Sequence, residues 1–244
     1  MSDYGITDYG ASALYSLNYS YYWMIILGAI ICLIASARVK STFKKYSRMT
    51  STTGLTGAQA AERMLAAAGI TDVRVVPTRG ELTDNYNPSS KTVNLSEPVY
   101  SSNSVAAIGV ACHECGHAIQ HAKGYAPITF RSALVPVANI GSTLSWPLIV
   151  VGFFFNGNMG LFFIQLGIIA FSLSVLFQIV TLPVEFNASA RALRQIEDLN
   201  LVNGTEIKFT RKVLKAAAMT YVAGAASAIL QLLRLILLAQ RKRK

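Results

Sequence analysis

Four long apolar runs divide this chain, at residues 21–37, 132–155, 160–182 and 216–233. None of them contains a charged residue. A helix that crosses a membrane needs about 20 apolar residues, with a range of about 17 to 25. The first three runs therefore predict membrane-spanning helices. Arg234 follows the fourth run at once, so that run predicts either a short span or a helix lying in the membrane surface.

The stretch between the first two runs is more polar and predicts a small domain of helices and strands. Thr56-Gly57-Ala58-Gln59 fits a capping box, which opens a helix that Gly69 ends. Two segments have the composition of strands, Val73–Val76 and Lys91–Leu95, and a turn is predicted at Asn87–Ser90. A longer helix is then predicted, with capping side chains at Ser102–Ser104.

This longer helix carries the pattern His113-Glu114-Cys115-Gly116-His117 and all three histidines of the chain. On a helix, His113 and His117 lie on one face, one turn apart, so both rings can bind one metal ion from the same side. Glu114 flanks that face, where it can meet a water held by the metal. Gly116 keeps the helix thin beside the metal.

The third ligand is not identified by this spacing. His121 continues the histidine stripe, but it stands roughly 12 Å along a straight helix from His113. Zinc–nitrogen bonds are only about 2.0–2.1 Å long. Because the chain has no other histidine, a Glu, Asp or Cys from elsewhere must complete the site.

The cysteines suggest packing instead of redox chemistry. Cys112 and Cys115 form a C-x-x-C pair, but the βαβ context of a redox motif is missing. Gly116 follows Cys115, where c-type haem attachment needs a histidine. With Cys32 in an apolar run the count is odd, so we expect small buried thiols that do not bind the metal.

Composition agrees with a membrane protein. Apolar residues make up 52% of the chain and charged residues 14%, whereas about a quarter is usual for charged residues. The net charge of +10 raises the question of nucleic acid, but Lys and Arg flank the apolar runs and do not alternate with aromatic residues. The positive-inside rule explains them, so we expect a lipid bilayer and no nucleic acid as partner.

Charge also predicts the topology. Residues 1–20 contain no Lys or Arg, whereas five basic residues lie between positions 38 and 48. This bias places the N-terminus outside and residue 38 onward in the cytoplasm. A cleaved signal peptide is the rival interpretation, because Ala35-Ser36-Ala37 resembles a cleavage site, but the basic region of a signal peptide is missing.

Six longer motifs are similar to those of a known family: K-S-T-F-K-K-Y-S (40–47), G-L-T-G-A-Q (54–59), L-T-D-N-Y-N-P (82–88), H-E-C-G-H-A-I-Q-H (113–121), R-S-A-L-V-P-V-A-N-I-G-S (131–142) and L-P-V-E-F-N-A-S (182–189). With these, the chain resembles the YugP-type membrane zinc metallopeptidases of bacteria over most of its length. The resemblance implies a gluzincin-like site with one Zn²⁺ per chain. It maps the ligands onto His113, His117 and Glu185, with Glu114 as the general base. Cys115 stands where an aliphatic or small residue is expected.

The position of Glu185 agrees with this role. It follows an uncharged run and Pro183, near the membrane surface, where an unpaired carboxylate is unfavourable. Asn187 and Arg191 are close enough in sequence to orient it. The alternative is that Glu185 pairs with Arg191 at the interface. Three further acids lie in polar runs where we expect solvated side chains: Glu197, Asp198 and Glu206.

The whole pattern predicts an α+β membrane protein, in which transmembrane helices join a small zincin-like domain with the H-E-x-x-H helix and a short β-sheet. The predicted divisions are an extracytoplasmic tail (1–20), a transmembrane helix (21–37), a cytoplasmic zincin-like domain (38–131), a transmembrane helical hairpin (132–184), a helical segment with the third zinc ligand (185–215), a fourth transmembrane or interfacial helix (216–240) and a basic tail (241–244).

The leading functional hypothesis is a zinc-dependent endopeptidase of the bacterial cell membrane, with the metal on the cytoplasmic side and a peptide or protein as substrate. An oxyanion donor is needed, and the candidates are Arg191, Tyr221 and Tyr86. The strand before the metal helix, with Val93 and Asn94, either pairs its free edge with the substrate peptide or belongs to an ordinary sheet.

Two other classes of protein compete with this hypothesis. One is a non-catalytic, zinc-stabilised membrane scaffold or chaperone, but a structural zinc site needs a closed fourth position and no base, whereas this sequence keeps Glu114. The other is a transporter, which would carry ionisable residues within its spans. The long hairpin has none.

Overall fold

The fold is described from a computed structural model that covers residues 21–155 and 157–242. The chain divides into two compact units. Among the described residues, the first consists of 21–34, 134–155, 157–179 and 223–242, and the second of Ala35–Ala133 and Val180–Val222.

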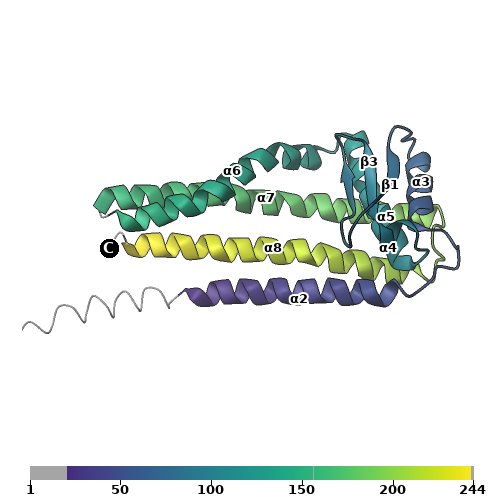
Figure 1. The fold of residues 1–244 in the computed structure, drawn as a ribbon, viewed down its shortest axis with the longest axis horizontal. Helices are drawn as coiled ribbons and strands as arrows, with labels where there is room; N and C mark the ends of the chain where they lie inside the picture. Colours follow the sequence, from purple (N-terminus) through teal and green to yellow (C-terminus); the bar gives the residue numbers. More distant parts are fainter. Residues whose placement is uncertain (1–20, 156, 243–244) are drawn as a thin grey trace, which may run out of the picture. The chain divides into compact units, whose positions relative to one another are not determined.

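The second unit contains all the strands among the described residues (Figure 1). Its elements are α3 (Gly57–Ala67), β1 (Arg74–Thr78), β2 (Asn85–Asn87), β3 (Thr92–Ser96), α4 (Glu97–Tyr100) and α5 (Val105–Ala122). The predicted capping box is present at Thr56: its hydroxyl accepts a hydrogen bond from the Gln59 N–H, and the Thr56 N–H donates one to the Gln59 side-chain oxygen. Ser104 caps α5 as predicted.

The three strands form one sheet in the order β1-β3-β2. β1 runs parallel to β3, and β2 runs antiparallel to it. β3 is therefore the central strand, paired on both sides, so of the two alternatives the free edge at Val93 and Asn94 is excluded and the ordinary sheet remains. Val93 is fully buried. Asn94 donates a side-chain hydrogen bond to Asn85 of β2. The free edges of this sheet belong to β1 and β2.

The core of this unit is apolar and surrounds α5. Its fully buried side chains include Met64 of α3, Leu95 of β3, Ile108 of α5 and Ile196 farther along the chain. Glu206 is buried too, at 8% exposure, which corrects the expectation of a solvated carboxylate. It accepts hydrogen bonds from the Ser51 hydroxyl and from the backbone N–H groups of Thr52 and Asn203. Glu206 therefore ties the loop before α3 to the start of the last helix.

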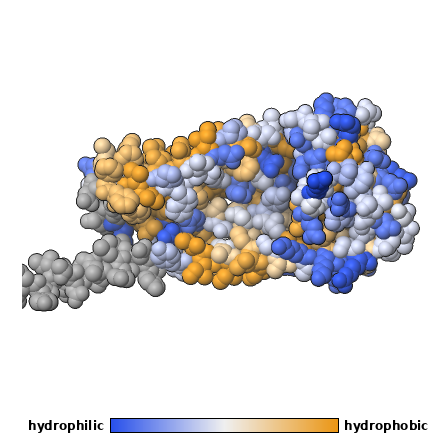
Figure 2. All heavy atoms as spheres, viewed as in Figure 1, coloured by the Kyte–Doolittle hydropathy of each residue, from blue (hydrophilic) through white to orange (hydrophobic). Residues whose placement is uncertain are grey.

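Within the described part of the chain, four helices are long and apolar enough to cross a membrane: α2 (Tyr22–Tyr46), α6 (Ala126–Phe154), α7 (Gly157–Asp198) and α8 (Ile207–Lys242). The last apolar run is part of the continuous α8, and the predicted hairpin (132–184) corresponds to α6 and the first part of α7. On the face seen in Figure 2, apolar side chains gather over the helices of the first unit. Among the residues of the first unit, Leu33, Ile140 and Ile169 are each more than 60% exposed. An exposed apolar surface of this kind suits a lipid environment.

Candidate metal centre

Three predicted ligands come together in the second unit. His113 and His117 lie on α5, and Glu185 lies on α7 and is buried. One ligand atom from each of the three lies within 4.8 Å of the others. The Glu185 Oε2 atom is 3.2 Å from Nε2 of His113 and 3.6 Å from Nε2 of His117.

The two histidine–glutamate distances are close to those expected around a zinc ion. Two ligand atoms that each lie about 2.1 Å from a tetrahedral metal stand about 3.4 Å apart. The two histidine–glutamate distances, 3.2 Å and 3.6 Å, lie on either side of this value. Two imidazole nitrogens and one carboxylate oxygen also form a donor set that catalytic zinc sites use.

The ring nitrogens on the far sides of the two histidines have partners of their own. Nδ1 of His113 lies 3.1 Å from the Ser189 hydroxyl. Nδ1 of His117 lies 3.0 Å from Oε1 of Gln120. Partners of this kind orient a ligating imidazole and fix its tautomer. In both rings, Nε2 is left to face Glu185.

The tautomer of His117 follows from a chain of hydrogen bonds. Arg191 Nε can only donate, so the Asn187 atom that it meets at 2.7 Å is the oxygen. That oxygen and the Val184 carbonyl both accept from Gln120, at 3.0 Å and 2.8 Å, so the Gln120 atom there is the amide nitrogen. Gln120 therefore turns its oxygen to His117, whose Nδ1 must carry the proton. In the neutral ring the lone pair is then on Nε2, the atom that faces Glu185.

Gly116 explains how α7 comes close enough to supply Glu185. A Cβ atom at this position would lie 2.6 Å from the Ala188 carbonyl oxygen, closer than real Cβ contacts. The absence of a side chain at Gly116 lets the backbones of α5 and α7 touch beside the metal ligands. This agrees with the predicted role of Gly116 in keeping the helix thin.

Glu114 lies beside the three ligands without being one of them. Its side chain is buried, at 9% exposure, and lines a cavity of about 150 Å³ together with His113, Glu185 and Tyr221. Burial raises the pKa of the Glu114 carboxyl, whereas the charges of His113 and His117 act to lower it. Tyr221 and Glu185 line this cavity from α8 and α7.

The other predicted residues lie at different places. Arg191 donates to Asn187 and lies over the Tyr125 ring at 5.6 Å, and it does not line the cavity with the ligands. The side-chain oxygen of Asn187 accepts a hydrogen bond from Gln120, so Asn187 helps to orient the partner of His117, and among the described residues it has no hydrogen bond to Glu185. Tyr86 packs against His121, with ring centroids 5.5 Å apart.

The cysteines of α5 behave as predicted from their side of the helix. Cys112 and Cys115 are fully buried, and Cys115 points its Sγ atom to the Ala61 carbonyl of α3. Burial raises the pKa of both thiols. Neither belongs to the metal-binding group, so packing is their role in this structure.

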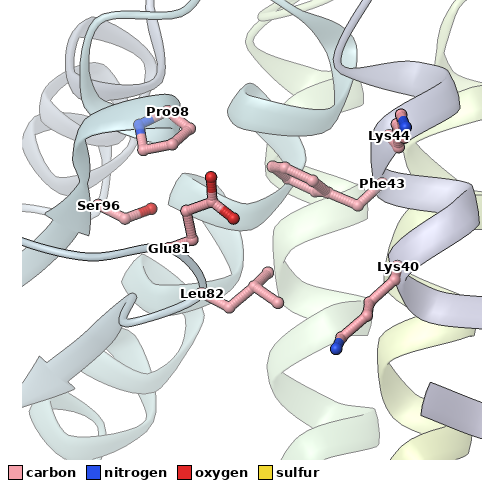
Figure 3. A pocket seen from close by; sticks show the side chains of 7 residues that line it. All are labelled: Lys40, Phe43, Lys44, Glu81, Leu82, Ser96 and Pro98. Atoms are coloured by element: carbon pink, nitrogen blue, oxygen red, sulfur yellow. The ribbon is translucent and has the colours of Figure 1, made fainter. Parts of the chain in front are cut away.

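A second cavity adjoins the one that holds the ligands. It measures about 490 Å³ and shares Phe43 and Leu82 with it. Figure 3 shows Phe43 of α2 pointing toward Glu81 and Leu82 of the loop between β1 and β2. Leu82 has a φ of 58°, which a residue with a side chain rarely adopts, and it is 55% exposed. Strained, exposed residues of this kind gather at functional sites.

Sequence reasoning missed two residues of this site, Gln120 and Ser189. Gln120 follows His117 by three residues on the same helix, so the helical spacing could have identified it as a partner of that ring. Ser189 lies on α7, and no local signal links it to His113.

These features describe a chain with four helices apolar enough to span a membrane, and with two histidines and one glutamate that could hold a metal ion beside a buried carboxylate. The chain belongs to the family described as "Putative neutral zinc metallopeptidase", which it matches over residues 21–240. It is 46% identical over 204 residues to the "Putative membrane protease YugP" of Bacillus subtilis (strain 168), covering 84% of this chain and 89% of that protein. No solved structure matches this chain.

Proposed function

We propose that this protein is an integral membrane endopeptidase that depends on one zinc ion per chain, held by His113, His117 and Glu185. The observation that carries the proposal is the spacing of the three ligand atoms beside the buried carboxylate of Glu114. The family and the relative support a peptidase role. A zinc ion at this site would polarise the scissile carbonyl and lower the pKa of the attacking water.

The residues of the chain perform the remaining steps. Glu114 takes the proton of the attacking water and passes it to the leaving amine. Gln120 and Ser189 hold the two imidazoles in position from behind. Tyr221 is the candidate that best suits the stabilisation of the oxyanion, because it alone of Arg191, Tyr221 and Tyr86 lines the cavity with Glu114.

The rival role, a zinc-stabilised scaffold or chaperone, has less support in this arrangement. A structural zinc site is closed by four protein ligands. Among the described residues, the group that could hold the metal has three members, and a cavity lies beside them. The open position and the neighbouring base favour catalysis.

The test is the Glu114→Gln variant of the full-length protein, purified in detergent. It should keep one zinc per chain, because Glu114 is not a ligand, and its hydrolysis of an unstructured protein such as casein should fall by at least about 100-fold. Metal content is measured by elemental analysis and cleavage by mass spectrometry of the products. Glu62→Gln is the matched control, because Glu62 is exposed on α3 and should keep full activity. Undiminished proteolysis by Glu114→Gln would refute the mechanism.

A further inference from the structure

Another cavity of the second unit, of about 220 Å³, is lined by three cationic side chains. Lys123 follows α5, Arg191 and Arg194 come from α7, and Gln195 adds an amide. The rest of the lining is apolar, from two alanines and Ile119, and includes no carboxylate. An ordinary water occupies about 30 Å³, so the space admits a compact oxyanion with a few waters.

The three cations are not neutralised by the protein. Within the described part of the chain, Lys123 and Arg194 have no ion pair and no side-chain hydrogen bond. Arg191 uses its Nε for Asn187 and rests over the Tyr125 ring, so its guanidinium is held in place at the cavity. Like charges that share one cavity repel each other, and a bound anion would relieve that repulsion.

The helix dipole explains the position of only one of the three cations that line the cavity. Lys123 is the C-cap residue of α5, where a cation is favourable in any case. Arg191 and Arg194 lie before the last turn of α7, so interaction with the C-terminal end of the helix dipole does not explain their positions. Arginine pairs are well suited to phosphate, because the planar guanidinium can donate two parallel hydrogen bonds to its oxygens.

The cavity is connected to the metal ligands. Arg191 donates a hydrogen bond to the side-chain oxygen of Asn187, and this oxygen also accepts one from Gln120. The Gln120 side-chain oxygen is in turn hydrogen-bonded to Nδ1 of His117. The three distances are 2.7, 3.0 and 3.0 Å. A change in the position or hydrogen bonding of Arg191 therefore reaches a metal ligand through two side chains.

We propose that this cavity binds a phosphate-class oxyanion, and that the bound anion acts on His117 through Arg191, Asn187 and Gln120. Binding of the anion stands apart from the proposed peptidase activity, whereas the effect on His117 rests on its role as a zinc ligand. An anion that fixes Arg191 also fixes Asn187 and Gln120, so zinc should bind more tightly when the cavity is occupied.

The first experiment measures the binding of radiolabelled inorganic phosphate to the metal-free, full-length protein in detergent by equilibrium dialysis. The double variant Lys123→Gln/Arg194→Gln should bind phosphate about tenfold more weakly than the wild type. The control Arg63→Gln/Lys212→Gln removes the same charge from exposed positions outside the cavity and should bind as the wild type does. Equal binding by all three proteins would overturn the proposal.

A second arm distinguishes a free anion from a lipid headgroup. The same three proteins are placed in nanodiscs of phosphatidylcholine with or without phosphatidylglycerol, and bound lipid is counted by native mass spectrometry. Retention of phosphatidylglycerol that depends on Lys123 and Arg194 identifies a lipid source. If neither phosphate nor phosphatidylglycerol binding depends on these residues, the site does not exist as proposed.

Coupling to the metal is read from zinc affinity, measured by competition with a chelator. Saturation of the cavity should raise zinc affinity several-fold in the wild type and in the control, and leave Lys123→Gln/Arg194→Gln unchanged. If zinc affinity in the wild type does not respond, the coupling is refuted while the peptidase proposal stands. If none of the proteins binds zinc, it is the proposed function that fails.

Discussion

The carboxylate of Glu185 lies within 3.6 Å of both histidine Nε2 atoms, and the proposed zinc site depends on it. We predict that Glu185→Ala loses zinc affinity by more than about 100-fold, because loss of a partner behind a ligand already costs about 10- to 100-fold. Metal content after dialysis against a chelator measures this. Glu197→Ala is the control, since Glu197 lies exposed on the same helix and should retain its zinc. One zinc per chain at wild-type affinity in Glu185→Ala would exclude the proposed ligand set.

Gln120 is fully buried and joins His117 to α7 through three hydrogen bonds. We predict that Gln120→Met, which keeps the volume and removes the amide, lowers zinc affinity by about 10- to 100-fold. His117 should also lose its preference for the tautomer that is protonated at Nδ1. The tautomer is measured by ¹⁵N NMR of labelled imidazoles in the metal-free protein. A merely structural role would lower the unfolding temperature and leave the tautomer of His117 unchanged.

The local part of the site could be predicted from the sequence. One helix sets the spacing of His113, Glu114 and His117, so their shared face follows from its geometry. Glu185 came from family resemblance, because 68 residues separate it from His117 and no period connects them. Ser189 could not be predicted, since its contact with His113 depends on how α7 packs on α5.

At the scale of the elements, the close contact of α5 with α7 positions Glu185. We predict that Gly116→Ala destabilises the protein by about 1–3 kcal/mol, because its methyl group would overlap the Ala188 carbonyl oxygen. It should also weaken zinc binding, since the two helices carry different ligands. Thermal unfolding in detergent and chelator competition measure the two effects.

Gly204→Ala is the matched control for this substitution, because a Cβ atom there would meet nothing within 4 Å. It should leave both stability and zinc affinity close to those of the wild type. Wild-type zinc affinity and stability in Gly116→Ala would show that the helices can separate without cost, against the close contact described above.

The helices and their caps could be predicted because their signals are local. The pairing of the strands in the sheet could not. The capping box of α3 and the cap of α5 were readable because each involves residues three apart. β2 was missed because three residues, Asn-Tyr-Asn, have little strand propensity without the ladder to β3. Without β2, the central place of β3 in the sheet could not be recognised.

At the scale of the whole molecule, the apolar runs predicted the helices because the bilayer sets a minimum length for each. They did not predict where the helices end. α7 continues past the apolar run to Asp198 and thereby carries Glu185 and Arg191 on one rigid element. The polar part of α7 is stabilised by packing in the second unit, where Ala188, Ala192 and Ile196 are fully buried.

The orientation of the chain in the membrane is the last prediction. Five basic residues between positions 38 and 48 place the second unit, with the metal centre, in the cytoplasm by the positive-inside rule. A membrane-impermeant maleimide applied to intact cells should therefore label Ser2→Cys and not Ser90→Cys. The native thiols should give little background, because Cys112 and Cys115 are buried and Cys32 is partly buried.

Permeabilised cells provide the control for this experiment. Ser90 is exposed, so Ser90→Cys should become labelled once the membrane is opened, which shows that its protection came from the membrane and not from the fold. Labelling of Ser90→Cys in intact cells, with protection of Ser2→Cys, would place the metal centre outside. The basic residues would then need another explanation, and the substrates would be extracytoplasmic peptides in place of cytoplasmic ones.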